Sequence, residues 1–301
     1  MPKKVLFTGS NGFLGKILVP ELKNLGYEVT TLSSREADYE IDLRKKDIPP
    51  FSSNYEIVFH AAGKAHSNPT SEEEKQTFFD VNLEGTRNLC RVLEQSYLPK
   101  AFIFVSTVAV YGLDSGFNIK EEHPLNGNTP YALSKIQAEE FLIEWCVKNN
   151  VTLSIIRPSL IAGPNAPGNL GSMVNGIRTG KYLSIGAGTA RKSILMAQDI
   201  AQLIPLLVEK GGVYNVCDDT QPSFRELETI ISNQLNKKQP KSIPYFVAKS
   251  MALVGDLLGS NAPINSSKLK KITESLTFSN EKAKNELGWK PSNVLENYKI
   301  K

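Results

Sequence analysis

The chain has 301 residues, of which 41% are hydrophobic and 22% are charged, and its formal net charge is +4. This composition is ordinary for a globular protein and excludes wholesale disorder. The mild basic excess forms no stripe interleaved with aromatic residues, so it favours a site for an anionic small molecule over a nucleic-acid surface.

Cysteines, histidines and apolar runs limit the setting in which the protein works. Three widely separated cysteines, Cys90, Cys146 and Cys217, suit buried thiols in a reducing cytoplasm better than a disulfide framework. The three histidines form no zinc-ligand cluster, so no metal site is expected.

No signal peptide precedes the first strand, and charged residues interrupt the apolar run at 245–258, so we expect a cytoplasmic protein without a membrane span. An amphipathic helix in that run could touch a membrane surface, although covering the core of a small domain is its commoner use.

Strand-like and helix-like segments alternate through the first half of the chain. The strands are apolar throughout, which is typical of a parallel sheet covered by helices on both faces. We therefore predict an α/β fold with a doubly wound parallel sheet of the Rossmann type. The predicted strands span residues 4–8, 28–32, 57–59, 101–106 and 152–156, and the predicted helices span residues 13–25, 73–96 and 131–149.

The pattern changes after the fifth predicted strand. Residues 162–171 are rich in Gly, Pro and Asn and predict a loop, and the rest of the chain indicates shorter helices with isolated strands. We expect residues 1–160 to form a dinucleotide-binding domain and residues 161–301 to form a smaller, mostly helical substrate-binding region. Segments near 190–220 are expected to return to the main sheet.

A glycine-rich turn follows the first strand and opens the first helix. The sequence TGSNGFLG at residues 8–15 places Gly9 at the tight turn, Gly12 where backbone N–H groups approach a pyrophosphate, and Gly15 where helix and strand pack closely. The helix N-terminus adds partial positive charge for the anion. This strand–turn–helix context predicts a dinucleotide site. Its expected contacts are Gly9, Asn11, Gly12, Phe13, Leu14 and Gly15.

The end of the second predicted strand bears on the choice of dinucleotide. NAD-preferring enzymes carry an Asp or Glu there for the ribose hydroxyls, whereas this chain has Ser33, Ser34 and Arg35. Hydroxyls and a guanidinium suit a 2′-phosphate, because Arg offers planar donors to such groups. We therefore favour NADP over NAD as the cofactor, although the adjacent Glu36 argues the other way.

A tyrosine and a lysine lie four residues apart at the start of the helix predicted at 131–149. Tyr131 and Lys135 therefore share one face of that helix. The phenol of tyrosine has a pKa near 10, which a nearby ammonium group, reinforced by an oxidised nicotinamide, is expected to lower. Tyr131 can then exchange a proton with a sugar hydroxyl.

Two hydroxyl side chains stand one strand earlier, at the carboxyl end of the strand predicted at 101–106. Open α/β sheets bind their ligands at that edge. Thr107 can hydrogen-bond the substrate oxygen and orient it toward Tyr131, and Ser106 is the neighbour that can share this role. The predicted catalytic residues are therefore Tyr131, Lys135, Thr107 and Ser106.

Together these motifs resemble those of extended short-chain dehydrogenases of the NAD(P)-dependent epimerase/dehydratase family, whose members mostly act on nucleotide sugars. The resemblance covers nearly the full length of the chain. Besides the turn and the tyrosine–lysine pair, it is carried by HAAG at residues 60–63, by the stretch DVNLEGTRNL around Asn82, by Arg157 and Pro158, and by LGWKP at residues 287–291.

The resemblance implies further contacts and an oligomeric state. On the substrate side it implies that Asn169 lies near the nucleotide diphosphate and that a cation binds a phosphate. Alignment on Asp199 places that cation at Lys192, with Arg191 adjacent. A homodimer built on the second and third predicted helices is also implied. The additional cofactor contacts are Asp42, Leu43, Ala61, Ala62, Gly63, Lys64 and Pro158, beside Tyr131 and Lys135.

Within this family the reaction depends on the step that comes after hydride transfer at sugar C4. A dehydratase needs an acidic pair where this chain has Val108 and Ala109, so dehydration is disfavoured. A preference for NADP suits a net reduction, and residues 60–66 (HAAGKAH) and 275–291 resemble enzymes that reduce 4-keto UDP-hexosamines for bacterial surface polysaccharides. We therefore predict a nucleotide-sugar 4-ketoreductase. A nucleotide-sugar 4-epimerase is the first alternative, and a non-catalytic dinucleotide-binding regulatory module is the second.

Overall fold

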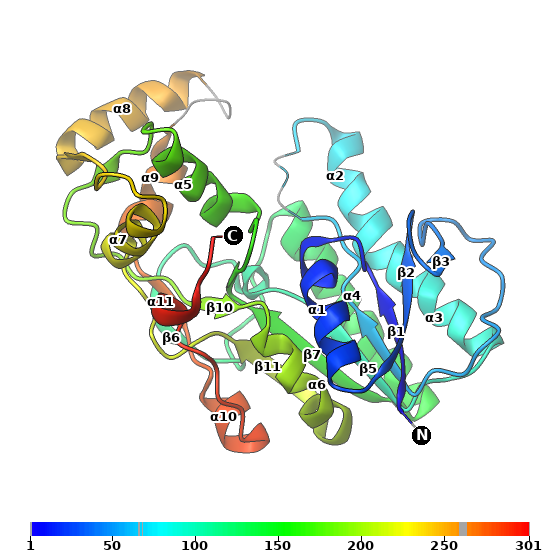
Figure 1. Ribbon diagram of the computed structural model, residues 1–301. Coiled ribbons are helices and arrows are strands. Elements are labelled where there is room, and N and C mark those ends of the chain that lie inside the picture. The colour runs from blue at the N-terminus through cyan, green and yellow to red at the C-terminus, as the bar shows by residue number, and fades with distance from the viewer. Residues whose placement is uncertain (1, 66, 68, 259–263, 301) are drawn as a thin grey trace.

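The computed structural model describes residues 2–65, 67, 69–258 and 264–300, so His66 of the HAAGKAH segment lies outside the described residues. Its centre is a seven-stranded sheet of parallel strands in the order β11-β7-β5-β4-β1-β2-β3 (Figure 1). This sheet confirms the doubly wound α/β prediction. Its strands are β1 (Lys4–Thr8), β2 (Glu28–Ser33), β3 (Tyr39–Glu40), β4 (Ile57–His60), β5 (Ala101–Val105), β7 (Thr152–Pro158) and β11 (Gly212–Val216).

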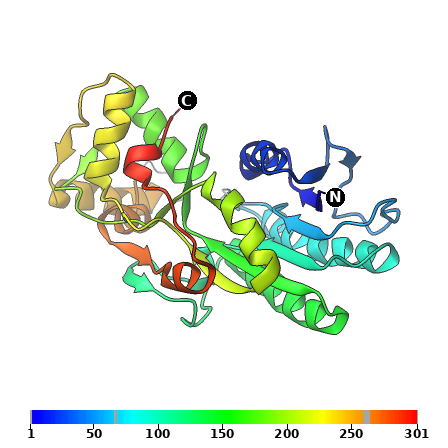
Figure 2. The ribbon, with the colours of Figure 1, turned by 60° about the horizontal axis from the view of Figure 1, so that its bottom comes forward.

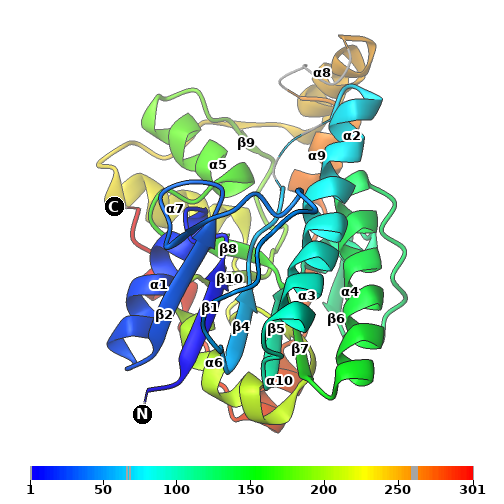
Figure 3. The ribbon, with the colours of Figure 1, turned by 90° about the vertical axis from the view of Figure 1, so that its right-hand side faces the viewer.

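Helices cover both faces of the sheet (Figures 2 and 3). One face carries α1 (Phe13–Asn24) and α6 (Asp199–Lys210), and the other carries α2 (Glu72–Phe79), α3 (Gly85–Gln95) and α4 (Pro130–Asn149). Because successive side chains of a strand point to opposite faces, an apolar strand supplies side chains to the hydrophobic cores on both faces of the sheet. The sheet is therefore buried on both sides, as the apolar strands predict.

Alternation along β1 and β4 shows how the two cores are built. Phe7 and Phe59 stack with their ring centroids 4.9 Å apart on the face that α1 and α6 cover. Leu6 and Val58, one residue earlier in each strand, belong to the core beneath α3 and α4. All four side chains are completely buried, so each strand contributes to both hydrophobic layers.

The strand order reverses between β1 and β4. From β1 the chain moves outward to β2 and β3, then crosses to the other side of β1 and forms β4, β5, β7 and β11. Open α/β sheets bind ligands outside the carboxyl ends of their strands at such a reversal. The fold therefore places a site next to Thr8 and His60, the last residues of these two strands.

The helix predicted at 73–96 is present but is not uniform. A π-helical turn, η1 (Asp80–Glu84), joins α2 to α3 without a break in the chain direction. A π-helical turn carries an extra residue relative to the α-helical repeat and rotates the side chains beyond it. Hydrophobic spacing alone did not predict this turn, because the apolar positions on either side still have helical spacing.

A second layer of structure is built from residues after β7. Its core joins β8 (Leu160–Ala162) and β10 (Ile194–Met196), which pair in parallel, to α5 (Gly168–Arg178), α7 (Phe224–Gln234) and α11 (Val294–Asn297). The loop predicted at 162–171 is wrong over its last residues, because α5 begins at Gly168. The buried residues of α5 are Leu170, Met173, Val174 and Ile177. Their helical spacing outweighs the preference of the Gly, Pro and Asn residues for a loop.

The remaining elements extend this second layer. The strands β6 (Gly116–Ile119) and β13 (Leu276–Phe278) pair in parallel, as do β9 (Ser184–Ile185) and β12 (Ser242–Ile243). The remaining helices are η2 (Val108–Tyr111), α8 (Tyr245–Leu258), α9 (Ser266–Thr273) and α10 (Glu281–Leu287).

Among the described residues, none of the helices combines the length and apolar character needed to span a bilayer.

Candidate active site

β1 ends in the glycine-rich turn, where the backbone leaves no room for a side chain at Gly9 or Gly15. Gly9 has a φ of +77°, and a Cβ built on it would lie 2.7 Å from the backbone nitrogen of Ala62. A Cβ on Gly15 would overlap the backbone of Ser10. Gly12 is the N-cap of α1, so the first N–H groups of that helix face the crevice at the strand reversal. This backbone can receive a pyrophosphate.

Side chains of the turn tie it to its surroundings. The amide nitrogen of Asn11 donates to the carbonyl oxygen of Arg35, which links the turn to the loop after β2. Leu14 packs against the sheet core, and Phe13 packs near Gly163 in the second layer. The Asn11 side chain therefore holds the turn against the loop that follows β2.

His60 lies at the centre of a buried hydrogen-bond chain behind the turn. Its Nδ1 is 2.6 Å from the hydroxyl of Thr8, and its Nε2 is 2.8 Å from the hydroxyl of Thr86. The Thr86 hydroxyl donates to the carbonyl oxygen of Asn82, so Nε2 carries the proton of a neutral ring. Thr8 accepts from the N–H of Ala62 at 3.2 Å and donates to Nδ1. His60 thus holds the ends of β1 and β4 together rather than facing a ligand.

Acid is expected to destabilise the fold through His60. Burial lowers the pKa of His60 to about 3, with the charge of Lys135 adding to the effect, whereas an unfolded histidine titrates near 6.5. Between these values only the unfolded chain binds the proton, so the free energy of unfolding falls as pH falls, by about 1.4 kcal/mol per pH unit. We expect the difference in the free energy of unfolding between the wild type and His60→Asn to shrink by about 2 kcal/mol between pH 6.5 and pH 5. Urea denaturation of both proteins at the two pH values measures this difference. A difference that is independent of pH would contradict this role, and His123→Asn serves as the matched control.

A pocket of about 350 Å³ opens at the reversal of strand order. It contains Ser33 and Ser34 from the end of β2, and it also contains Arg44, which the sequence patterns did not single out. The guanidinium of Arg44 contacts the carboxylate of Asp42 at 2.6 Å, and this bond holds the pKa of Asp42 below its usual value. The lining residues are Gly9, Gly12, Leu32, Ser33, Ser34, Ile41, Asp42, Leu43, Arg44, Ala61, Ala62, Gly63 and Val81.

The pocket and the turn fit a nicotinamide dinucleotide. The backbone N–H groups of the turn can cradle the pyrophosphate, and the Ser33, Ser34 and Arg44 side chains can serve the adenosine ribose. Arg35 is not among the residues described as lining this pocket. Asp42 is present where a carboxylate near the adenine was expected, but it is already engaged by Arg44.

The predicted catalytic tyrosine and lysine lie on the first turns of α4. The hydroxyl of Thr129 accepts from the N–H of Ala132 at 3.2 Å and fixes the start of the helix. The buried ammonium of Lys135 donates to the carbonyl oxygen of Val105 at 2.8 Å. A Cβ on Gly63 would lie 3.2 Å from that ammonium, so Lys135 is directly behind the wall of the dinucleotide pocket.

Thr107 completes the group at the carboxyl end of β5. Its hydroxyl accepts from the N–H of Ala109 at 3.2 Å and is also a hydrogen-bond partner of the Tyr131 phenol. Tyr131 packs against Phe78 of α2, with ring centroids 6.2 Å apart. The structure therefore brings Thr107, Tyr131 and Lys135 together beside the dinucleotide pocket.

The ionisation of Tyr131 differs from the sequence-based expectation. Burial raises the pKa of the Tyr131 phenol, and the hydrogen bond from Thr107 offsets only part of that effect. The lowering expected from Lys135 does not outweigh this effect of burial. Burial also lowers the pKa of Lys135 to about 8, against the opposing influence of Glu139. At neutral pH Tyr131 therefore keeps its proton and Lys135 keeps most of its charge.

Asn82 lies in the π-helical turn and connects that turn to two other parts of the site. Its side-chain oxygen accepts from the N–H of Lys64 at 2.7 Å, and its nitrogen donates to the Lys64 carbonyl at 3.1 Å. The same nitrogen donates to the hydroxyl of Ser134 at 2.9 Å, which in turn donates to the carbonyl of Tyr131 at 2.8 Å. Asn82 thus positions both the segment after β4 and the first turn of α4.

Ser106 does not face the same space as Thr107. Its hydroxyl donates to the buried carboxylate of Glu139, which forms an ion pair of 2.6 Å with Arg157. Arg157 also donates to the hydroxyl of Tyr111 at 3.1 Å, and Tyr111 donates to the side-chain oxygen of Asn215 at 2.6 Å. Ser106 therefore belongs to a buried polar network behind the site. Hydroxyl identity alone could not predict this, because the partners lie on distant segments.

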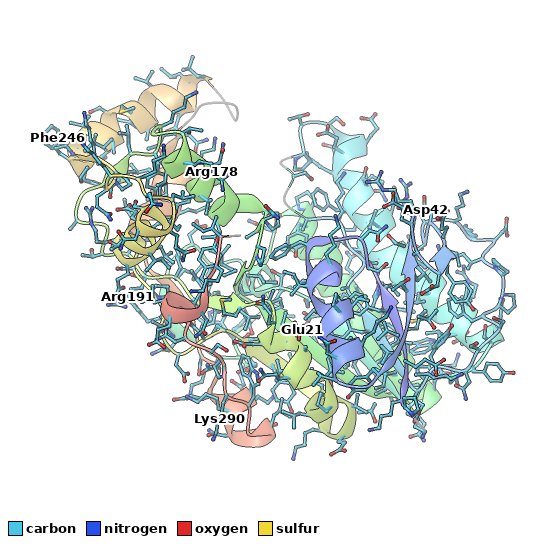
Figure 4. The ribbon with its side chains drawn as sticks, in the orientation of Figure 1. Glu21, Asp42, Arg178, Arg191, Phe246 and Lys290 are labelled. Carbon is cyan, nitrogen blue, oxygen red and sulfur yellow. The ribbon has the colours of Figure 1, made fainter. Side chains whose placement is uncertain are left out.

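The residues expected on the substrate side lie in the second layer. Asn169 is exposed on the first turn of α5. Arg191 donates to the carbonyl of Gln221 at 2.9 Å and lies on the opposite side of the molecule from Asp42 (Figure 4). Lys192 is partly buried, and burial lowers its pKa to about 8. Asp199 instead anchors the C-terminal segment, accepting from the N–H and hydroxyl of Ser292 at 2.8 and 2.7 Å.

Comparisons with known proteins agree with this geometry. A family model described as NAD dependent epimerase/dehydratase family matches residues 5–217. The N-acetyl-alpha-D-glucosaminyl-diphospho-ditrans,octacis-undecaprenol 4-epimerase of Escherichia coli O157:H7 is 30% identical, covering 92% of this chain and 88% of that enzyme. The GDP-6-deoxy-D-mannose reductase of Pseudomonas aeruginosa is 27% identical, covering 77% and 80%. The structure of the UDP-glucose 4-epimerase of Thermotoga maritima with UDP-glucose shares the fold, with a TM-score of 0.76 at 22% identity, covering 99% of this chain and 96% of that one.

Proposed function

This chain belongs to the NAD dependent epimerase/dehydratase family, and on that premise we propose that it is a 4-ketoreductase for sugars carried on a nucleoside diphosphate. It is an enzyme that uses a nicotinamide dinucleotide, which donates or accepts a hydride when bound. The meeting of Thr107, Tyr131 and Lys135 beside the dinucleotide pocket supports hydride chemistry at sugar C4, and the pocket residues after β2, which suit NADP, favour a net reduction. Nucleotide sugars made in this way would serve the assembly of surface polysaccharides.

The ionisation state of the site suits the protonation step of a reduction. Tyr131 keeps its proton at neutral pH and can donate it to the oxygen of a C4 carbonyl as that carbon is reduced. Thr107 can hold the same oxygen by a hydrogen bond, and the charge of Lys135 stabilises the phenolate that remains. Ser106 then acts as a positioning residue, because its hydroxyl fixes Glu139 rather than the substrate.

A 4-epimerase is the second candidate, and a specific observation favours it. The E. coli relative at 30% identity is named as a 4-epimerase of a sugar on a diphosphate. The same three residues suffice for that reaction. Tyr131 would first accept the proton of the C4 hydroxyl and later return it to the C4 oxygen, while the hydride returns to the opposite face of C4. The two reactions therefore differ in their net consumption of reduced dinucleotide and not in their catalytic side chains.

A panel of UDP- and dTDP-sugars, incubated with and without NADPH and analysed by mass spectrometry, separates the two candidates. Reductase activity gives a product heavier by two hydrogens from a 4-keto substrate, and NADPH is consumed. An epimerase gives a product of equal mass and altered retention without consumption of NADPH. If neither product forms from any 4-keto or 4-hydroxy sugar, the proposal is wrong.

The dinucleotide preference can be tested at the pocket residues that follow β2. We propose that NADP is the preferred cofactor, because Ser33, Ser34 and Arg44 line the pocket. Charge-assisted hydrogen bonds to a 2′-phosphate are worth about 1.5–3 kcal/mol, so Arg44→Ala should weaken NADP⁺ binding by about tenfold or more and leave NAD⁺ binding unchanged. Titration calorimetry measures both, with the exposed Lys45→Ala as the control. Tighter binding of NAD⁺ than of NADP⁺ by the wild type would contradict the assignment.

The second layer is proposed to hold the rest of the substrate. We assign the diphosphate to Asn169 and Lys192, because Arg191 is engaged by the Gln221 carbonyl and by Glu226 at 3.7 Å. Lys192 is the better phosphate partner, since its charge lies in a partly buried setting where electrostatic interactions are less screened. Residues 1–160 then serve the dinucleotide and residues 161–301 serve the sugar nucleotide.

We also propose that two copies associate through α3 and α4 in the cytoplasm. A groove of about 340 Å³ between these helices is lined by Phe141 and Trp145 among charged residues, and Ile143 and Val147 are exposed on α4. Cys90, Cys146 and Cys217 are buried free thiols, which suits a reducing compartment. Sedimentation equilibrium of the purified protein would report the dimer directly.

A further inference from the structure

The helix α8 presents its large apolar side chains outward. Its buried residues are small, namely Ala248, Ala252 and Gly255, and they pack on Ile185 and Leu269. At 3.6 residues per turn, the opposite side of the helix carries larger side chains. An ordinary surface helix shows the reverse pattern, with large apolar residues inside and polar residues outside. The exposed apolar side chains are Tyr245, Phe246, Met251, Leu253, Val254, Leu257 and Leu258.

The outward face is strongly exposed and nearly free of charge. Phe246 is 71% exposed and lies at the outer edge of α8, while Leu257 is 88% exposed (Figure 4). The two charged residues of α8, Lys249 and Asp256, lie between the inner and outer faces rather than at the outer pole. A continuous apolar surface of this kind marks an interaction site.

Lysines are concentrated in the stretch of sequence that contains α8. Residues 237–273 contain seven lysines, no arginine and one acidic residue, Asp256, which gives this segment a charge of +6. Because the whole chain carries +4, the rest of the protein carries −2, so the basic character is concentrated here. One of these lysines, Lys270, lies 3.4 Å from Asp114. The seven are Lys237, Lys238, Lys241, Lys249, Lys268, Lys270 and Lys271.

The helix lies on the side of the molecule that holds the site. Figures 1 and 3 share their vertical axis, and both show α8 at the top, the direction in which β1 runs toward the glycine turn. A flat surface in contact with α8 would therefore lie on the same side of the protein as the carboxyl ends of the strands.

We propose that α8 and its lysines dock the protein peripherally on an anionic lipid surface. The apolar side chains would enter the boundary between headgroups and acyl chains, and the lysines would pair with lipid phosphates. A second copy of this chain is a poorer occupant of the same face, because it would set two groups of lysines against each other. The docking does not depend on the proposed reaction, since it involves no residue of the catalytic group.

Flotation of the full-length protein with vesicles tests the proposal. Vesicles of equimolar phosphatidylglycerol and phosphatidylcholine should carry the wild type, vesicles of phosphatidylcholine alone should carry much less, and added salt should release it. The double variant Phe246→Ser/Leu257→Ser should lose at least about tenfold in partitioning, because both side chains leave an apolar environment. Both are exposed in the free protein, so the variant should fold, and its turnover of a water-soluble substrate should be unchanged.

The matched control is Phe117→Ser/Leu25→Ser, which removes one aromatic and one aliphatic side chain of similar exposure elsewhere on the surface. It should float like the wild type. Absence of the wild type from anionic vesicles would overturn the proposal, and so would equal binding by the two double variants. A vesicle-independent oligomer that only Phe246→Ser/Leu257→Ser dissociates would assign the face to a second copy instead.

Discussion

Replacing Tyr131 by phenylalanine is expected to lower kcat by about a thousandfold while leaving dinucleotide binding unchanged. The variant lacks the proton donor at the reacting oxygen, and a positioned general acid is worth about 10²–10⁴ in rate. The ring itself remains, so its packing against Phe78 and the start of α4 should be preserved. Steady-state kinetics on the substrate found in the panel measure kcat, and calorimetric titration measures dinucleotide binding.

Tyr97→Phe is the control for this substitution, because Tyr97 is an exposed tyrosine outside the site. It should keep wild-type kcat. Full activity in Tyr131→Phe would mean that another group transfers the proton, and the catalytic assignment would fail. Joint loss of activity and of the native circular dichroism spectrum would instead show that the phenol holds the fold together.

Glu139→Gln is expected to lower the free energy of unfolding by about 3–5 kcal/mol. Glu139 and Arg157 form a 2.6 Å ion pair whose side chains are only 2% and 6% exposed. Without the carboxylate charge, the guanidinium of Arg157 remains buried with no counter-charge of equal strength. Urea denaturation at pH 7 measures the loss, and the midpoint should move without a change in the denaturant dependence.

The neighbouring Glu140→Gln is the matched control, since Glu140 is exposed on the same helix and should change stability by less than about 0.5 kcal/mol. The double variant Glu139→Gln/Arg157→Gln should recover part of the loss, because it removes both buried charges. Equal destabilisation by Glu139→Gln and Glu140→Gln would contradict the importance of the buried pair.

The main sheet and its helices can be predicted closely from local sequence patterns. Apolar strands such as 57–59 and 101–106 are short, continuous and bounded by breakers, so their burial on both faces can be predicted without tertiary information. The start of α5 could not be predicted in this way. Gly168 and Asn169 favour a loop by composition, and they join the helix because Leu170 and Ile177, which follow at helical spacing, pack against the second core.

The candidate site could be predicted where its residues lie close together in the chain. The glycine turn and the Tyr131–Lys135 pair are local patterns, and the structure places both at the carboxyl edge of the sheet. Roles that depend on distant partners were missed. The attachment of Ser106 to Glu139 and Arg157, and the direction of the pKa shift of Tyr131, depend on burial and contacts that no local pattern encodes. Arg44 could have been suspected from the sequence, because it follows Asp42, an expected cofactor contact, by only two residues.

Reduction of a 4-keto nucleotide sugar in deuterium oxide, with unlabelled NADPH, tests the central claim most directly. Hydride transfer from NADPH to C4 predicts a product with ordinary hydrogen on C4, as read by nuclear magnetic resonance, because solvent deuterium then enters only the exchangeable O–H and N–H positions. Solvent deuterium bound to C4 would show that a proton, not a hydride, reaches that carbon. That result would contradict the assignment of this site to hydride chemistry.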